Sequence, residues 1–130
     1  MHEFVVETGS KEELIDITSL IRRAVQNAEA TGGACHVYAP HTTAAITINE
    51  HADPSVADDL VTALGRIVPQ DGPWRHSEGN SPAHVKASLV GSSVVVGIDD
   101  GQLALGTWQG IFLCEFDGPR TRRVWLRILS

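Results

Sequence analysis

The most regular part of the chain is residues 93–129, SVVVGIDDGQLALGTWQGIFLCEFDGPRTRRVWLRIL. Apolar and β-branched residues recur there in short runs separated by polar or glycine-containing turns, which is typical of consecutive strands. The runs cover residues 93–98, 103–107, 111–116 and 122–129. Connections this short join antiparallel neighbours, so this half of the chain is expected to form mostly antiparallel sheet.

The first half of the chain adds further strand-like runs and a helix. Alternating or apolar runs predict strands at residues 2–8, 12–17, 34–39 and 44–49. From Thr18 onward apolar residues recur at helical spacing, and Gly32-Gly33 ends that helix. Pro40-His41 separates the last two strand-like runs.

Two polar residue–proline pairs mark further helix starts. In Asp53-Pro54 a capping residue precedes a proline at the first helical position, and an apolar stripe continues to Pro69. Ser81-Pro82 repeats this signal for a short helix that ends at Gly91. The sequence therefore predicts one α+β domain over residues 1–130, with mostly antiparallel sheet, two main helices and one short helix.

The charge balance argues against a nucleic-acid partner. The 130 residues include 10 Lys and Arg and 16 Asp and Glu, a formal charge of −6, and no basic run occurs. No segment has the features of a signal peptide or an apolar stretch long enough to span a bilayer. Cys35 and Cys114 lie inside apolar runs, which predicts buried thiols rather than a disulfide framework. We therefore expect a cytoplasmic protein that binds neither nucleic acid nor membrane.

The polar side chains that carry chemistry gather in four short segments. Residues 76–86, His-Ser-Glu-Gly-Asn-Ser-Pro-Ala-His-Val-Lys, combine two imidazoles, a carboxylate, a carboxamide and a helix start. Similar groups occur in residues 41–43, 49–53 and 115–120. A structural loop needs Gly, Asn, Ser and Pro for its turns, but it gains nothing from two histidines and a glutamate. Four such segments in one small domain predict one shared pocket.

Three histidines from separate segments are candidate metal ligands. His41 at a strand break, His76 in a loop and His84 in the first turn of a helix would supply three nitrogen ligands, and catalytic zinc needs three ligands and an open position. Surface and capping histidines are also common, so a structural role stays open. Asp53 has a similar alternative, because an N-cap carboxylate at the mouth of a pocket can serve both as a cap and as a base.

The densest positive cluster is Arg120, Arg122 and Arg123. These side chains either hold a small phosphate or keep the adjacent strand in contact with water. For Arg122 and Arg123 we favour the second role, because charged side chains next to a strand usually form a solvated face.

Taken in chain order, the polar segments resemble the YjbQ-like family, which is also called the secondary thiamine-phosphate synthase family. The blocks that carry the resemblance are His41-Thr-Thr-Ala-Ala-Ile-Thr-Ile-Asn-Glu50, Ala52-Asp53-Pro54, His76, Glu78-Gly-Asn80, Ala83-His84-Val-Lys86, Leu105-Gly-Thr-Trp-Gln-Gly-Ile111, Glu115 and Gly118-Pro-Arg120. The resemblance implies an α+β fold, assembly as a homotrimer, and a polar pocket near the subunit boundary with a metal or anion site. A symmetric interface would also provide partners for Trp108 and Gln109.

The resemblance further implies which residues form the site. The positions that match the family's polar motif are His41, Asn49, Asp53, His76, Glu78, Asn80, His84 and Arg120. In the resulting hypothesis a divalent metal, zinc or magnesium, is held by His41, His76 and His84. The predicted anion-binding residues are Asn49, Asn80, Lys86 and Arg120, and the predicted catalytic residues, which move a proton or orient a cation, are Asp53, Glu78 and His84.

Two functions from different classes follow. In the first, the protein is a metal-assisted enzyme on a phosphorylated or anionic small molecule, with a low thiamine-phosphate synthase activity in which a thiazole phosphate nitrogen displaces pyrophosphate from an activated pyrimidine. In the second, it is a non-catalytic, trimeric protein that binds a ligand or a metal. The sequence leaves both open.

Overall fold

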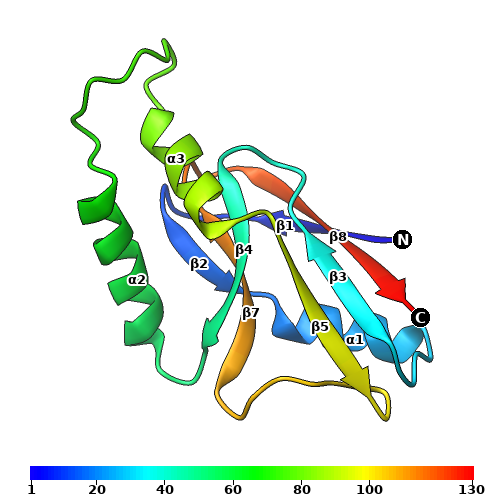
Figure 1. The fold of residues 1–130 in the computed structure, drawn as a ribbon. Coiled ribbons are helices and arrows are strands. Elements are labelled where there is room, and N and C mark those ends of the chain that lie inside the picture. Colours follow the sequence, from blue (N-terminus) through cyan, green and yellow to red (C-terminus); the bar gives the residue numbers. More distant parts are fainter.

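The computed structural model describes residues 1–130 and contains two antiparallel sheets and three helices (Figure 1). The helices are α1 (Thr18–Asn27), α2 (Pro54–Ile67) and α3 (Ser81–Val90). The strands are β1 (His2–Glu7), β2 (Glu13–Asp16), β3 (Ala34–Tyr38), β4 (Ala44–Glu50), β5 (Ser93–Asp99), β6 (Gln102–Leu103), β7 (Gln109–Glu115) and β8 (Thr121–Leu129). The predicted α+β class with mostly antiparallel sheet is confirmed.

The strands form a five-stranded sheet in the order β1-β8-β3-β5-β6 and a three-stranded sheet in the order β2-β7-β4. The main core includes Ile21 and Val25 of α1, Leu113 of β7 and Leu126 of β8. Helix α1 therefore packs with both sheets around one apolar interior (Figure 1).

Alternation along β4 gives the three-stranded sheet a second buried face. Ala44 and Ile46 join the main core, whereas Ala45 between them packs with Ala83 and Ala87 of α3. Small residues on both sides allow α3 to lie close to the sheet. This contact fixes the helix that carries His84.

Helix α2 is packed differently from the other two helices. Its N-cap Asp53 accepts a hydrogen bond from the backbone N–H of Ser55, as the sequence predicts, but none of its residues is buried. The helix stands at one side of the molecule, and Ile67 near its end is largely exposed (Figure 1).

One detail of the predicted elements is wrong. The strand expected at residues 103–107 is reduced to β6, because the Gly106 N–H donates to Oε1 of Gln109 and the Gln109 N–H donates to the Gly106 carbonyl, which closes a turn. Helix α3 covers the ten residues Ser81–Val90 and ends at Gly91, as predicted.

The cysteines are buried as predicted, and both are free thiols. Burial raises the pKa of the Cys114 thiol to about 12, so this thiol stays protonated at neutral pH. None of the three helices is both long and apolar enough to cross a membrane.

Candidate functional site

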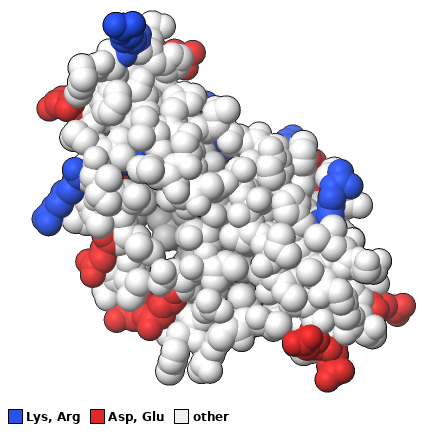
Figure 2. All heavy atoms as spheres, in the orientation of Figure 1, with Lys and Arg blue, Asp and Glu red and all other residues white.

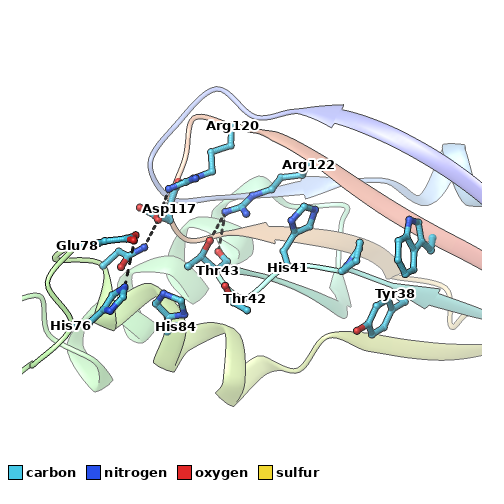
Figure 3. A pocket seen from close by; sticks show the side chains of 13 residues that line it. Tyr38, His41, Thr42, Thr43, His76, Glu78, His84, Asp117, Arg120 and Arg122 are labelled. Atoms are coloured by element: carbon cyan, nitrogen blue, oxygen red, sulfur yellow. Dashed lines mark hydrogen bonds and ion pairs between the residues drawn. The ribbon is translucent and has the colours of Figure 1, made fainter.

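A polar pocket of about 750 Å³ opens where β3, β8 and the start of α3 approach one another (Figure 3). Only two of its 13 lining residues are hydrophobic. The lining residues are Tyr38, Pro40, His41, Thr42, Thr43, His76, Glu78, Asn80, His84, Asp117, Arg120, Arg122 and Trp125. Such a lining suits a charged or strongly polar ligand rather than an apolar one.

One lining residue, Arg122, forms a buried ion pair with Glu115 behind the pocket wall. Glu115 is fully buried, and Arg122 is 4% exposed. Nε of Arg122 donates to Oε1 of Glu115 at 2.9 Å, and Nη2 donates to Oε2 and to Oγ1 of Thr43. The Glu115 carboxylate also accepts hydrogen bonds from the Thr8 hydroxyl and from the backbone N–H of Asp117. Burial alone would raise the pKa of Glu115, but these hydrogen bonds, led by Arg122, hold it below its usual range.

A second arginine is fixed at the rim by a carboxylate. Arg120 donates from Nε to the Asp117 carbonyl at 2.6 Å and from Nη2 to Oδ2 of Asp117 at 2.9 Å. The same carboxylate oxygen accepts from Nδ2 of Asn80 at 2.8 Å, which joins the β7–β8 turn to the loop before α3. Arg120 is therefore held toward the pocket while half of its side chain stays exposed (Figure 3).

Two histidines form the opposite wall. The rings of His76 and His84 lie edge to face with their centroids 5.2 Å apart, and Nε2 of His76 is 3.8 Å from Oε2 of Glu78 (Figure 3). His84 comes from helix α3, whereas His76 and Glu78 belong to the exposed loop before it. Proton donors and acceptors thus face the two arginines across the pocket.

His41 has a different environment from the other two histidines. Its Nε2 accepts a hydrogen bond from the backbone N–H of Arg123 at 2.8 Å. Burial and the nearby Arg122 guanidinium lower the pKa of His41, so the neutral ring is favoured. In this neutral ring we assign the hydrogen to Nδ1, because Nε2 is an acceptor.

The predicted three-histidine metal centre does not fit this arrangement. A metal ligand needs a free lone pair, but Nε2 of His41 is engaged and Nδ1 carries the hydrogen. Nowhere in the structure do three or more His, Cys, Asp or Glu side chains gather closely enough to hold a metal ion. We therefore derive no chemistry through a metal in this pocket.

The structure brings together six of the predicted site residues and separates three. The pocket contains His41, His76, Glu78, Asn80, His84 and Arg120. Asn49 and Asp53 lie at the other end of β4, because Asn49 pairs with Gly110 while Ala44 near the pocket pairs with Glu115. The expectation of one pocket for all four polar segments is therefore wrong for residues 49–53.

Lys86 is also outside this pocket. Two residues along a helix correspond to about 200°, so Lys86 points away from His84. Its buried Nζ donates to Oε2 of Glu12 at 2.6 Å in a neighbouring cavity of about 200 Å³. The cation predicted to bind phosphate is instead half of an ion pair.

The prediction for Arg122 is also wrong, since this side chain was expected to contact water but is buried. Its position relative to Val124 and Leu126, at steps of two along β8, places it on the buried face of the strand. This alternation was present in the sequence. Tyr38 and Trp125, whose rings lie 5.8 Å apart, are further lining residues that were not predicted.

Comparison with known proteins places the chain in a family. The sequence model described as "UPF0047 protein YjbQ-like" matches residues 2–130. The chain belongs to the YjbQ-like family. A UPF0047 protein of Methanocaldococcus jannaschii is 47% identical over 130 residues, covering 100% of this chain and 94% of that protein. The UPF0047 protein YugU of Bacillus subtilis is 46% identical over 126 residues, 96% of each chain.

Solved structures of YjbQ-like proteins have the same fold. A YjbQ/UPF0047 family protein from Clostridium acetobutylicum superimposes with a TM-score of 0.97 at 48% identity, covering 99% of this chain and 100% of that one. A conserved hypothetical protein from Thermus thermophilus gives a TM-score of 0.92 at 41% identity, covering 99% and 100%. The resemblance to the YjbQ-like family and the fold that it implies are therefore confirmed.

Proposed function

We propose that the pocket binds a small phosphorylated molecule and transfers a proton to or from it. The observation that carries the proposal is the convergence of Arg120, Arg122, His76 and His84 on one polar cavity. Both guanidinium groups are oriented in advance by carboxylates, and neither Nη1 atom donates to a protein acceptor. Planar guanidinium groups with free N–H groups bind phosphate oxygens well.

The histidine pair provides the second part of the chemistry. His84 and His76 lie across the cavity from the arginines, at positions where they can donate to an oxygen of a bound phosphate or remove a proton next to it (Figure 3). An imidazole ring can either donate or accept a proton through its two nitrogens, so it suits both directions of transfer. We assign Glu78 an orienting role for His76, because its carboxylate lies beside Nε2.

The reaction we assign to this pocket is the displacement of pyrophosphate from an activated pyrimidine by a thiazole phosphate. A C–N bond forms at the pyrimidine methylene carbon, the C–O bond to pyrophosphate breaks, and the departing oxygen gains negative charge. Arg120 and Arg122 stabilise that charge, and a protonated histidine donates to the leaving group.

Growth of a thiamine auxotroph tests the enzymatic part. Expression of the wild-type chain should rescue growth, whereas His84→Ala and Arg120→Ala should fail, because loss of a proton donor or of a phosphate ligand costs about 10²-fold or more in rate. Arg127→Ala is the matched control, since it removes an exposed arginine of β8 that does not line the pocket. Full rescue by His84→Ala and Arg120→Ala would leave a binding protein as the remaining function.

We further propose that the chain acts as a homotrimer in the cytoplasm. The amphipathic helix α2 buries none of its residues in the single chain, and Trp108 is 63% exposed. Apolar surface of this kind is usually covered by another protein surface. Contacts between identical chains in a closed ring would cover it.

A further inference from the structure

A fixed pair of His51 and Asp16 lies at the end of β4 opposite the pocket. Nδ1 of His51 is 2.8 Å from Oδ2 of Asp16. The other oxygen, Oδ1, accepts from the backbone N–H of Thr18 at 2.9 Å and from the Thr18 hydroxyl. That hydroxyl in turn accepts from the Ile111 N–H at 2.9 Å, which connects the pair to the buried strand β7.

The imidazole of His51 is held in one orientation. Its backbone N–H donates to the Trp108 carbonyl at 3.0 Å, and the ring lies so close to Gly110 that a Cβ there would be 2.5 Å from the ring atoms Cγ and Nδ1. Burial raises the pKa of Asp16, but the Thr18 hydrogen bonds and His51 hold it below its usual range. Because the ionised carboxylate only accepts, we assign the hydrogen of this contact to Nδ1 of His51, and Nε2 makes no hydrogen bond within the chain.

His51 and Asp16 line a hollow of about 250 Å³ between β2, β7 and the start of α2. The apolar part of its wall is Leu14, Pro54, Ala57 and Phe112, and the polar part is Asp16, Glu50, His51, Asp53 and Asp58. No lysine or arginine lines it. Figure 2 has the orientation of Figure 1, in which α2 begins at the lower left. Asp and Glu side chains lie toward the lower edge of the molecule in this view, and no Lys or Arg is visible there.

We propose that this hollow is a second ligand site, which binds a small protonated primary amine. One ammonium N–H donates to Nε2 of His51, and the carboxylates around it balance the positive charge. The apolar wall formed by Leu14, Ala57 and Phe112 receives the alkyl chain. The site shares no lining residue with the phosphate pocket, so it does not depend on phosphate binding there.

The chemistry of the hollow selects this ligand class over others. A phosphate or carboxylate would meet several negative charges and no cation. A metal ion would need a set of ligands that the structure does not gather anywhere. A neutral alcohol can donate to His51 but gains nothing from Asp53 and Asp58. The amine is either a free metabolite or the side chain of a lysine on another protein.

Side-chain nitrogen NMR of the histidines at pH 8, where alkylamines are protonated, tests the proposal directly. Titration of the full chain with butylammonium chloride should move the Nε2 resonance of His51 in a saturable way. Tetramethylammonium, which has no N–H, and butanol, which has no charge, should not move it. Equal shifts with tetramethylammonium or butanol, or no saturable shift with butylammonium, would overturn the proposal.

Two neighbouring aspartates of α2 provide a matched pair of variants. Asp58 lines the hollow and Asp59 does not, although both are exposed and carry the same charge. Asp58→Asn should weaken butylammonium binding about threefold or more, while Asp59→Asn changes it by less than about twofold. His51→Asn should weaken it at least about tenfold. Equal effects of the two aspartate variants on butylammonium affinity would show that the ammonium is attracted only by the general negative charge of this surface. That result would overturn the proposal of a specific site.

A titration with a lysine-containing peptide distinguishes the two possible sources of the amine. An acetylated Gly-Lys-Gly peptide is titrated beside butylammonium under the same conditions. Tighter binding of the peptide identifies a lysine side chain as the natural occupant, and tighter binding of butylammonium identifies a free amine. Failure of both, with pyrophosphate still binding in the main pocket, would overturn this site and leave the phosphate function untouched.

Discussion

The buried pair of Glu115 and Arg122 is the residue-level contact on which the pocket most depends. Glu115→Gln leaves the Arg122 guanidinium buried without a counter-charge, so it should lower the free energy of unfolding by about 3–5 kcal/mol in denaturant titrations. The exposed pair of Arg123 on β8 and Glu3 on β1 is the matched control. Glu3→Gln should cost less than about 1 kcal/mol. Similar losses for both variants would mean that the buried pair has no special role.

The same variant has a definite pH signature. The pKa of Glu115 is held below its ordinary value of 4.5 in the folded chain, so the unfolded chain takes up this proton at a higher pH. The stabilisation is therefore complete above pH 4.5 and is lost as the pH falls through the folded-state pKa. Wild-type stability should fall more steeply than that of Glu115→Gln over this range.

Individual site residues were predictable from the sequence where the chemistry is local. The segment of residues 76–86 contains both pocket histidines that face the arginines, and its unusual composition was enough to identify them. The pair of Asp16 with His51 was not predicted, because these residues are 35 positions apart and only the fold brings them together. The pair of Glu115 with Arg122 was not predicted, because Arg122 was expected to contact water. The contact between His51 and Asp16 is therefore visible only in the folded structure.

Helix α3 positions His84 through its contact with the three-stranded sheet. Ala87 is buried against Ala45 and Cys114, so Ala87→Leu should overpack this contact, lower the free energy of unfolding by about 1–3 kcal/mol and displace His84. Ser88→Leu adds the same side chain at the next, exposed position. It should change the free energy of unfolding by less than about 0.5 kcal/mol in thermal or denaturant unfolding. Equal destabilisation by both variants would contradict the close packing.

The elements with strong local signals were predicted almost to the residue. Asp53-Pro54 and Ser81-Pro82 each mark the start of an observed helix, because capping and a fixed proline φ act locally. The strand expected at residues 103–107 failed for a different reason. Leu103 and Leu105 both pack on the main core, which explains the apolar pattern of this segment. The turn closed by Gln109 prevents Leu105 from continuing the hydrogen bonding between β5 and β6.

The arrangement of the strands in two sheets could not be predicted from periodicity. Strands β2 and β7 are far apart in the chain but are paired, and β3 lies between β5 and β8 in the larger sheet. Along β4, Ala44 pairs with Glu115 near the pocket, whereas Asn49 pairs with Gly110 at the other end. Asn49 and the following Asp53 therefore lie outside the predicted pocket. The pairing of the strands therefore determines which polar residues meet in the pocket, and the composition of the segments does not show it.

The exposed apolar surface of the single chain leads to an expectation about assembly. Sedimentation equilibrium should give three times the chain mass of 14.0 kDa at micromolar concentration. Trp108→Ala is expected to shift the distribution toward smaller species if this exposed ring lies in the interface. Arg127→Ala, on the exposed end of β8, serves as the control. A wild-type chain that sediments as a monomer would rule out the trimer.

The binding of inorganic pyrophosphate tests the central claim most directly. In isothermal titration calorimetry the wild-type chain should bind pyrophosphate at one site, and Arg120→Ala should weaken the affinity about tenfold or more, because a charge-assisted contact is lost. Arg127→Ala, which removes an exposed arginine outside the pocket, should bind as the wild type does. Absence of pyrophosphate binding to the wild-type chain, or equal affinities for wild type and Arg120→Ala, would contradict the account.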